Sequence, residues 1–404
     1  MATRREALGG LAVAGGMSVL GGEAWAAGAA GVVVPFELTH DRIWTIVKFN
    51  GHGWYKLIID TGADKFSLDE KICKEIGLTR RSSEEMVGAT GAQYMNTYLA
   101  QTVSIANVVS DPNALVIGLI RPLDDGLQGL LPGALLDNVL FDFVQKRMHL
   151  SHSKPAGLQG FTVVPYVEVG TASNGSMDHV RQTSAYPYVR AELDGRPLTL
   201  RVDTGTPDGA YLNASYVDRA GLWDKYKGGR DTKAAGVGNH VSAARSVKAE
   251  SLKLGDIVFP SPRVTLQDPK DKGQGDFDLR GDVQEDGLLG IESLRRLDLA
   301  IVPTEGRLYI RKNAMFDDVQ RINRAGLLVR SVNDKPTAVW VYQGGPAWVA
   351  GVREGDLIVG YAGGDGTMAG LDWKLSGPPG DEIDLEYSRG GQTKQVSFKL
   401  VEVE

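Results

Sequence analysis

A run of β-prone apolar residues enters a turn headed by aspartate at two places in the chain. The first run covers residues 56–63 (KLIIDTGA) and the second covers residues 199–206 (TLRVDTGT). Apolar runs of this length, bounded by glycine and aspartate, predict β-strands that end in tight turns. Each is followed by a helix-like segment, which ends at Gly77 in the first copy and at Gly221 in the second. Glycine suits a helix C-terminus, so the pattern predicts one strand–turn–helix unit that occurs twice.

The two copies continue to correspond beyond these helices. The later matching segments are residues 126–129 (GLQG) and 287–290 (GLLG), and the predicted final strands at 146–150 and 306–310. Equivalent residues are 143 positions apart at Asp60 and Asp203 but 161 apart at Asp137 and Asp298. The second copy therefore contains roughly 18 additional residues, and we expect the polar residues 268–281 to hold them as a surface loop.

Composition narrows the class of protein. The 404 residues exceed the usual size of one core and predict two or three domains. The apolar content of 42% is typical of a globular protein, and the 51 glycines favour a β-rich fold with many turns. A net charge of -6 without a Lys/Arg-rich run lacks the cationic surface that nucleic acids need, so we expect no nucleic-acid partner. The lone Cys73 is expected to be a small buried side chain.

The order of these features resembles that of the retropepsin-like aspartic peptidases. The shared order is a strand, Asp-Thr-Gly, a glycine-containing hairpin, an apolar-apolar-Gly segment, a short helix, aspartate and a final strand. It covers about residues 35–151 and 163–312. Many members supply one Asp-Thr-Gly per chain and pair two chains, whereas this chain contains both copies, as pepsins do. The resemblance implies a mainly β fold with two retropepsin-like closed β-barrel lobes, a catalytic cleft between them and a functional monomer.

The resemblance also implies roles for the residues of both turns. Asp60 and Asp203 are expected to form a catalytic dyad that activates water and protonates the leaving amine. Two adjacent carboxylates cannot both ionise easily, so such a pair shares one proton. The threonines are expected to brace the two loops against each other, and the glycines to let backbone N–H groups approach the carboxylates. These supporting residues are Thr61, Gly62, Thr204 and Gly205.

Two further family features can be assigned in each copy. Leu288-Leu289-Gly290 matches the segment that packs beneath each loop, whereas Leu127-Gln128-Gly129 departs from it because Gln128 is polar. Glycine-rich hairpin tips near residues 87–91 and 235–239 are the expected flaps that close over an extended substrate. The flap glycines are Gly88, Gly91, Gly236 and Gly238.

Competing chemistries have little support. The six histidines include no zincin spacing, and neither a Gly-x-Ser-x-Gly elbow nor a phosphate-binding loop occurs. Two carboxylates with no evident further ligands would make a poor metal site. We therefore expect neither a metal nor a cofactor.

The pattern changes after Lys312. Residues 345–359 (GPAWVAGVREGDLIV) closely resemble the short helix, turn and strand of bacterial PDZ domains. Residues 367–375 are the expected groove helix, and residues 383–387 and 395–400 the closing strands. PDZ grooves usually bind the C-terminal end of a peptide through backbone N–H groups. The equivalent loop here is Gly326, Leu327, Leu328 and Val329, in which Leu328 replaces the usual glycine, so either peptide binding or a purely bracing role fits.

The N-terminus has the three parts of an export signal. Arg4 and Arg5 precede an apolar stretch up to about Leu20, and Ala24-Trp25-Ala26 follows as a cleavage site. The paired arginines resemble the twin-arginine motif. We expect export to the periplasm or secretion, with membrane anchoring as the alternative if the signal is not cleaved.

Together these observations predict four segments: a signal peptide (residues 1–29), two retropepsin-like lobes (30–155 and 156–314) and a PDZ-like domain (315–404). The predicted function is that of an exported aspartic endopeptidase acting on polypeptide, whose PDZ-like module recognises substrate or partner peptides. The alternative is a non-catalytic exported adaptor in which two degenerate lobes bind peptide. Intact Asp60 and Asp203 favour the enzyme, whereas Gln128 favours the adaptor.

Export predicts a processed N-terminus. Mature protein isolated from its native host should begin at about Ala27 or a few residues later, because cleavage is expected after Ala24-Trp25-Ala26. Intact-mass measurement and N-terminal sequencing of the protein check this. Cytoplasmic protein that retains Met1 would contradict it.

Overall fold

The computed structural model describes most of the chain between residues 31 and 402. The described residues are 31–39, 42–88, 91–106, 109–120, 123, 126–133, 138–167, 186–236, 241–271, 284–318, 323–332, 335–364 and 366–402. The predicted signal segment, residues 1–29, lies outside them. None of the described helices is long and apolar enough to cross a membrane.

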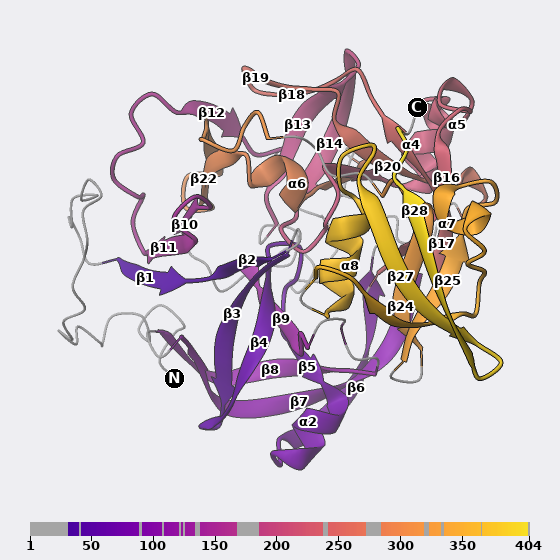
Figure 1. Ribbon diagram of the computed structural model, residues 1–404. Coiled ribbons are helices and arrows are strands. Elements are labelled where there is room, and N and C mark those ends of the chain that lie inside the picture. The colour runs from indigo at the N-terminus through magenta and orange to yellow at the C-terminus, as the bar shows by residue number, and fades with distance from the viewer. Residues whose placement is uncertain are drawn as a thin grey trace.

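The described strands form four sheets, and helices are short, so the predicted mainly β fold is confirmed (Figure 1). Apolar and polar side chains alternate along these strands. In β3 (Arg42–Phe49) every second side chain is buried, including Ile43, Val47 and Phe49. Such period-two burial places one face of a strand on the core and the other toward solvent or a cleft.

The first lobe contains a sheet in the order β2-β3-β4-β9-β5-β8-β7-β6. An additional pairing of β3 with β7 connects two separated strands of this order. Its other strands are β2 (Glu37–Thr39), β4 (His52–Asp60), β5 (Phe66–Asp69), β6 (Thr79–Gly88), β7 (Gly91–Ile105), β8 (Val109–Leu119) and β9 (Gly129–Pro132). Helix α2 (Glu70–Glu75) follows β5 and is capped by the Asp69 side chain.

The second lobe repeats this arrangement with the order β16-β17-β20-β15-β21-β14-β13-β18-β19. Its strands are β13 (Tyr188–Leu193), β14 (Arg196–Val202), β15 (Ala210–Leu212), β16 (Arg230–Ala235), β17 (Val241–Lys248), β18 (Ser251–Leu254), β19 (Ile257–Pro260), β20 (Arg263–Gln267) and β21 (Gly287–Leu289). Its helices are α4 (Ala214–Arg219), α5 (Leu222–Lys225), the 3-10 turn η2 (Pro269–Asp271) and α6 (Ile291–Leu294). Complete closure of both lobes into barrels stays a prediction.

The two lobes share a sheet, in the order β1-β11-β10-β22-β23-β12. Its strands are β1 (Val32–Pro35), β10 (Asn138–Asp142), β11 (Arg147–Ser151), β12 (Thr162–Pro165), β22 (Leu297–Val302) and β23 (Arg307–Lys312). The first copy supplies β1, β10 and β11, and the second supplies the other three. The central pairing of β10 with β22 joins the copies by backbone hydrogen bonds.

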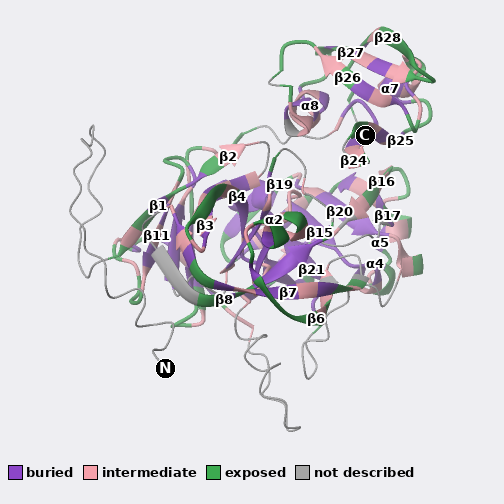
Figure 2. Cartoon of the chain, turned by 90° about the horizontal axis from the view of Figure 1, so that it is seen from below, coloured by how far each residue is buried: buried purple, intermediate pink, exposed green. Residues whose placement is uncertain are grey.

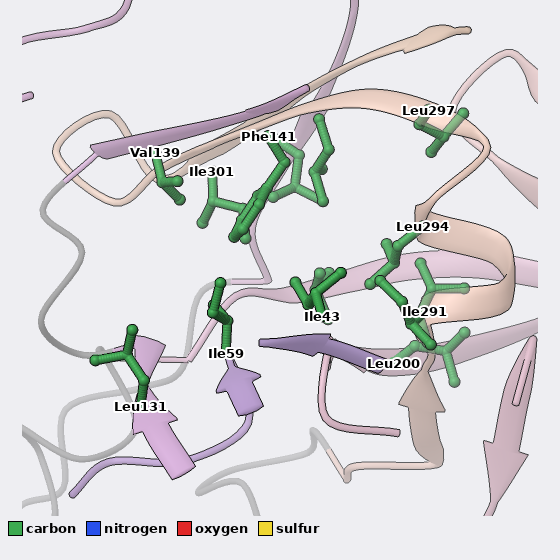
Figure 3. Packing of buried hydrophobic residues seen from close by; sticks show 14 of the residues in the cluster. Ile43, Ile59, Leu131, Val139, Phe141, Leu200, Ile291, Leu294, Leu297 and Ile301 are labelled. Atoms are coloured by element: carbon green, nitrogen blue, oxygen red, sulfur yellow. The ribbon is translucent and has the colours of Figure 1, made fainter. Parts of the chain in front are cut away.

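One hydrophobic core runs through both lobes and the shared sheet. Figure 3 shows Val139 and Phe141 of β10 beside Ile301 of β22, with Ile59 of β4 below them. Leu200 of β14 and Ile291 of α6 lie in the same cluster. The lobes therefore cannot separate without exposing apolar surface, which costs about 25 cal/mol per Å².

The two-copy correspondence extends to helix ends and to the added loop. Gly77 and Gly221 both follow their helices with positive φ, 69° and 64°, as the sequence predicts. Strand registers make Val116 equivalent to Val264, 148 positions apart, and Gly129 equivalent to Gly287, 158 apart. Ten of the additional residues thus lie between β20 and β21, the interval that contains the predicted insertion at 268–281.

The C-terminal residues form a separate small unit with its own hydrophobic core. Its sheet has the order β24-β25-β26-β27-β28. The strands are β24 (Leu327–Val332), β25 (Lys335–Val341), β26 (Leu357–Tyr361), β27 (Glu382–Arg389) and β28 (Gln392–Lys399), with helices α7 (Pro346–Val349) and α8 (Met368–Leu375). The predicted helix at 367–375 and the two closing strands are therefore present, and Gly390 and Gly391 form the turn between them with positive φ.

The C-terminal unit contacts the second lobe near β16, as Figure 2 shows for β24 and β25. The Arg230 side chain of β16 donates to the Asn323 carbonyl and lies 5.2 Å from the Tyr342 ring. Burial lowers the pKa of Arg230 to about 10. Phe316 belongs to the core of the lobes, where its ring centroid lies 5.4 Å from that of Phe259. The lobes therefore extend past the predicted boundary between residues 314 and 315.

Candidate active site

Asp60 and Asp203 occupy equivalent positions in the two lobes. Asp60 is the last residue of β4, and Asp203 directly follows β14. Each preceding strand lies parallel to a buried strand, β9 in the first lobe and β21 in the second. These central strands hold each aspartate at the start of its turn.

Reciprocal threonine hydrogen bonds connect the two turns. The Thr61 N–H donates to Thr204 Oγ1 at 3.1 Å, and the Thr204 N–H donates to Thr61 Oγ1 at 3.0 Å. Each hydroxyl also donates to a carbonyl of the opposite lobe: Thr61 to Val202 at 2.8 Å and Thr204 to Ile59 at 2.6 Å. Both threonines are buried, so these groups have no water to replace a lost partner. The structure thus brings the two predicted bracing residues together.

The two glycines allow each backbone to approach both carboxyl groups. Gly62 N–H donates to Asp60 Oδ1 and Gly205 N–H donates to Asp203 Oδ1, each at 2.8 Å. A Cβ atom on Gly62 would lie 2.6 Å from the Asp203 carboxyl carbon, and one on Gly205 would lie 2.5 Å from that of Asp60. Any larger residue would therefore push the two carboxyl groups apart.

The two carboxyl groups interact directly. Burial raises the pKa of Asp60 well above its usual range, and the negative charge of Asp203 and a hydrogen bond between the two side chains raise it further. The Gly62 N–H and the charge of Arg201 act in the opposite direction but are weaker. Burial and the neighbouring carboxyl group therefore favour the protonated form of Asp60. Two carboxyl groups that share one proton offer one acid and one base.

The apolar segment beneath the first loop was wrongly assigned from the sequence. Gly129, Leu130 and Leu131 pair with β4 as Gly287, Leu288 and Leu289 pair with β14, so Leu130 and Leu131 take the apolar positions. A Cβ on Gly129 would lie 1.9 Å from the Ser67 carbonyl oxygen, and one on Gly287 would lie 2.0 Å from that of Tyr211. The sequence match failed because both segments contain glycines at short spacing.

Gln128 is instead equivalent to Asp286. The Lys56 N–H donates to Gln128 Oε1 at 3.1 Å, and the Thr199 N–H donates to Asp286 Oδ2 at 2.7 Å. A polar acceptor is therefore used at this position in both lobes. Gln128 is no sign of degeneration in the first lobe.

The flap glycines lie on the two predicted hairpins. Gly88 pairs with Gly91 at the end of the β6–β7 hairpin, and Gly236 directly follows β16 of the β16–β17 hairpin. Residues 89–90 and 237–240, which include Gly238, lie outside the described residues. The hairpins are thus in place, and their closure over a substrate stays a prediction.

The predicted peptide-binding loop lies at the start of β24, an edge strand of the described C-terminal sheet. Gly326 has a φ of 70°, Leu327 and Val329 are buried, and Leu328 is partly exposed. Helix α8 packs beside β24, and Arg330 forms a 3.2 Å ion pair with Asp372 of that helix. This loop is remote in sequence from both Asp-Thr-Gly turns and supplies none of the contacts to the carboxyl pair described above.

Three residues near the aspartates were missed by the sequence argument: Arg201, Thr206 and Glu285. Thr206 Oγ1 donates to Asp203 Oδ2 at 3.0 Å, and Arg201 Nε lies 3.4 Å from Glu285 Oε2. Arg201 places a charged side chain between the apolar Leu200 and Val202, directly before the turn, which was the available signal. Among the described residues no group of three or more His, Cys, Asp or Glu side chains could hold a metal ion.

Both Asp-Thr-Gly turns lie in segments that match a known protein family. A family model described as aspartyl protease matches residues 45–132 and 189–293, which include both Asp-Thr-Gly turns. A solved structure of the aspartic proteinase from Irpex lacteus is 13% identical, covers 72% of this chain and 99% of its own, and gives a TM-score of 0.45. A search of curated proteins finds no match.

The threonine bonds predict a measurable contribution to stability. Thr204→Val should lower the free energy of unfolding by about 2–4 kcal/mol, because it leaves the Ile59 carbonyl and the Thr61 N–H without this buried partner. Thr204→Ser keeps the hydroxyl and should cost about 1 kcal/mol for the lost methyl group. Urea unfolding of both variants checks this. Equal stability of the two variants would show that the hydroxyl is not needed.

Proposed function

We propose that this chain is an exported aspartic endopeptidase with one active site per chain. The observation that carries the proposal is the pairing of Asp60 with Asp203 by reciprocal hydrogen bonds between Thr61 and Thr204. The match to an aspartyl protease family supports a polypeptide substrate. Export rests on the N-terminal sequence, through Arg4 and Arg5.

In the proposed reaction a water molecule lies between the two carboxyl groups. The ionised carboxylate removes a proton from the water as the water oxygen attacks the carbonyl carbon of the peptide bond. The protonated carboxyl group gives its proton to the carbonyl oxygen, which forms a tetrahedral diol. A carboxyl proton then moves to the amide nitrogen, the C–N bond breaks, and the diol loses its proton to the other carboxylate.

The alternative function is a non-catalytic adaptor that binds peptide between the lobes. The sequence feature that favoured it was Gln128, which accepts a backbone hydrogen bond as Asp286 does in the second lobe. Both aspartates also retain the short N–H contacts that a carboxyl pair needs. The endopeptidase is therefore the better supported function.

We further propose that the C-terminal unit is a PDZ-like module that binds the C-terminal end of a peptide. The edge strand β24 and the adjacent helix α8 support this, because PDZ grooves add a peptide strand between such elements. Its role is to select or regulate substrates. It contributes no residue to bond cleavage.

The dyad proposal predicts that each aspartate is indispensable. Asp60→Asn and Asp203→Asn should each abolish hydrolysis of a denatured protein substrate, with little change in fold, because either change removes one member of the proton-sharing pair. Their losses should not add in the double variant. Hydrolysis is followed by mass spectrometry of the products, with inhibition of the unaltered protein by a statine-type mimic as the control.

The same variants test whether one chain suffices. Mixing separately purified Asp60→Asn and Asp203→Asn proteins should restore no activity, because both aspartates come from one chain. Recovery of activity on mixing would show that the lobes of different chains pair.

Removal of the C-terminal unit separates recognition from cleavage. Truncation after Asp318 keeps Phe316 in the core of the lobes and should leave hydrolysis of a short unstructured peptide largely intact. Cleavage of protein substrates that depend on the module should fall. A truncated chain that remains folded by circular dichroism but has lost all hydrolysis of the short peptide would place the module in the catalytic unit.

A further inference from the structure

The residue two positions before each aspartate lies on the same face of its strand as the aspartate. Side chains alternate along a strand, and Leu57 and Ile59 of β4 point into the main core while Ile58 joins a separate cluster. Arg201 has the equivalent position in β14, because Ile58 pairs with Leu130 as Arg201 pairs with Leu288. Ile58 and Arg201 therefore flank the two carboxyl groups.

The surroundings of Ile58 are apolar. Ile58, Leu127 and Leu130 are buried together, and Trp44 and Ala63 pack against them. Lys56, two residues earlier in β4, places its Nζ 4.8 Å from the centre of the Trp44 ring. The side chains that pack around Ile58 itself are therefore apolar.

The equivalent positions of the second lobe are polar or charged. Strand register makes Trp44 equivalent to Tyr188, since each pairs with the flanking residue of its own lobe. Leu127, two residues before Gly129, corresponds to Glu285, and Ala63 corresponds to Thr206. The apolar cluster of one lobe is thus replaced by Arg201, Glu285, Tyr188 and Thr206 in the other.

Arg201 and Glu285 form a buried ion pair. Their side chains are 6% and 4% exposed, and Arg201 Nε lies 3.4 Å from Glu285 Oε2. Tyr188 forms a hydrogen bond with Glu285. Burial alone would lower the pKa of Arg201, but the charge of Glu285 and those of its other neighbours outweigh it, so Arg201 stays protonated.

Arg201 also reaches the turn of the first lobe. Its Nη1 donates to the Gly62 carbonyl at 3.4 Å, and its guanidinium carbon lies 5.1 Å from the Tyr186 ring centre. Four ionisable neighbours raise the pKa of Arg201: Glu285, Tyr188, Asp203 and Tyr186. The charge of Arg201 in turn lowers the pKa of Asp60. The charge of Asp64 raises the pKa of Tyr186. The cation therefore lies within range of both members of the carboxyl pair.

Hydrogen bonding shows the same asymmetry. Asp203 accepts from the Gly205 N–H and from the Thr206 hydroxyl. Asp60 accepts from the Gly62 N–H, and Ala63, the equivalent of Thr206, has no hydroxyl to add. Donors stabilise a carboxylate over a carboxylic acid.

We propose that the second lobe holds the negative charge of the carboxyl pair on Asp203. Arg201 is a positioning residue whose positive charge stabilises that carboxylate, and the negative charge of Glu285 partly offsets this stabilisation. Asp203 then acts as the base toward water, and Asp60 carries the proton that goes to the carbonyl oxygen. This assignment rests on the proposed peptidase function for its role in the reaction. The position of the negative charge on Asp203 does not depend on that function.

Two variants that should shift the pH profile of hydrolysis in opposite directions test the proposal. Arg201→Ile/Glu285→Leu installs the residues of the first lobe, Ile58 and Leu127, and removes the cation. Without it the anionic forms of the pair are less stable, so both limbs of the pH profile of kcat/KM should move up by about one pH unit. Glu285→Gln leaves the cation without its counter-charge, and both limbs should move down.

Ile58→Leu is the matched control, because it alters packing at the equivalent position without a change in charge. Both limbs of its pH profile of kcat/KM should coincide with those of the unaltered protein, whatever its rate of hydrolysis. If the double variant folds and its limbs also stay in place, Arg201 is a packing residue and the proposal is wrong. If Glu285→Gln fails to fold, the double variant alone decides.

Carbon-13 NMR titration of the aspartate carboxyl groups gives a readout that does not need activity. Assignments come from Asp60→Asn and Asp203→Asn. In the unaltered protein Asp203 should be ionised at a pH where Asp60 is protonated, and the titration should move up in Arg201→Ile/Glu285→Leu. An inactive protein with this titration would refute the peptidase function and keep the inference, whereas an ionised Asp60 beside a protonated Asp203 would overturn the inference.

Discussion

The reciprocal hydrogen bonds of Thr61 and Thr204 are the constraint on which the site depends. They hold two turns that lie 143 positions apart in sequence at a spacing that forces their carboxyl groups together. Two adjacent carboxyl groups repel each other when both are ionised, so their proximity needs a rigid frame. The shared sheet, in which β10 pairs with β22, and the common core supply that frame from below.

The repeated lobes provide two similar halves, and the differences between them provide the chemistry. Backbone features are equivalent: both turns donate a glycine N–H to their aspartate, and both lobes use a polar side chain, Gln128 or Asp286, as an acceptor for a strand N–H. The side chains that flank the aspartates are not equivalent, because Ile58 is replaced by Arg201. A symmetric pair of carboxyl groups would share its charge equally, whereas this one has its cation and its additional donor on one side.

The C-terminal unit has its own core and meets the second lobe at β16, the strand that leads to the second predicted flap. The Arg230 side chain makes this contact against Tyr342 and the Asn323 carbonyl. The C-terminal unit and the second lobe are thus joined at a strand of the second predicted flap hairpin.

The sequence by itself determined the two-fold repeat, the positions of Asp60 and Asp203, the helices that end at Gly77 and Gly221, and the C-terminal unit, because strand alternation and glycine-dependent turns are local properties. The sequence did not determine the strand register beneath the first loop, because short glycine-containing segments match at several offsets. Only the pairing of β9 with β4 shows that Leu130 and Leu131 are the apolar pair. The ion pair of Arg201 with Glu285 was also decided by tertiary structure, since it joins residues from separate elements. Burial gives these two charges their effect on the carboxyl pair, and burial is a property of the folded chain.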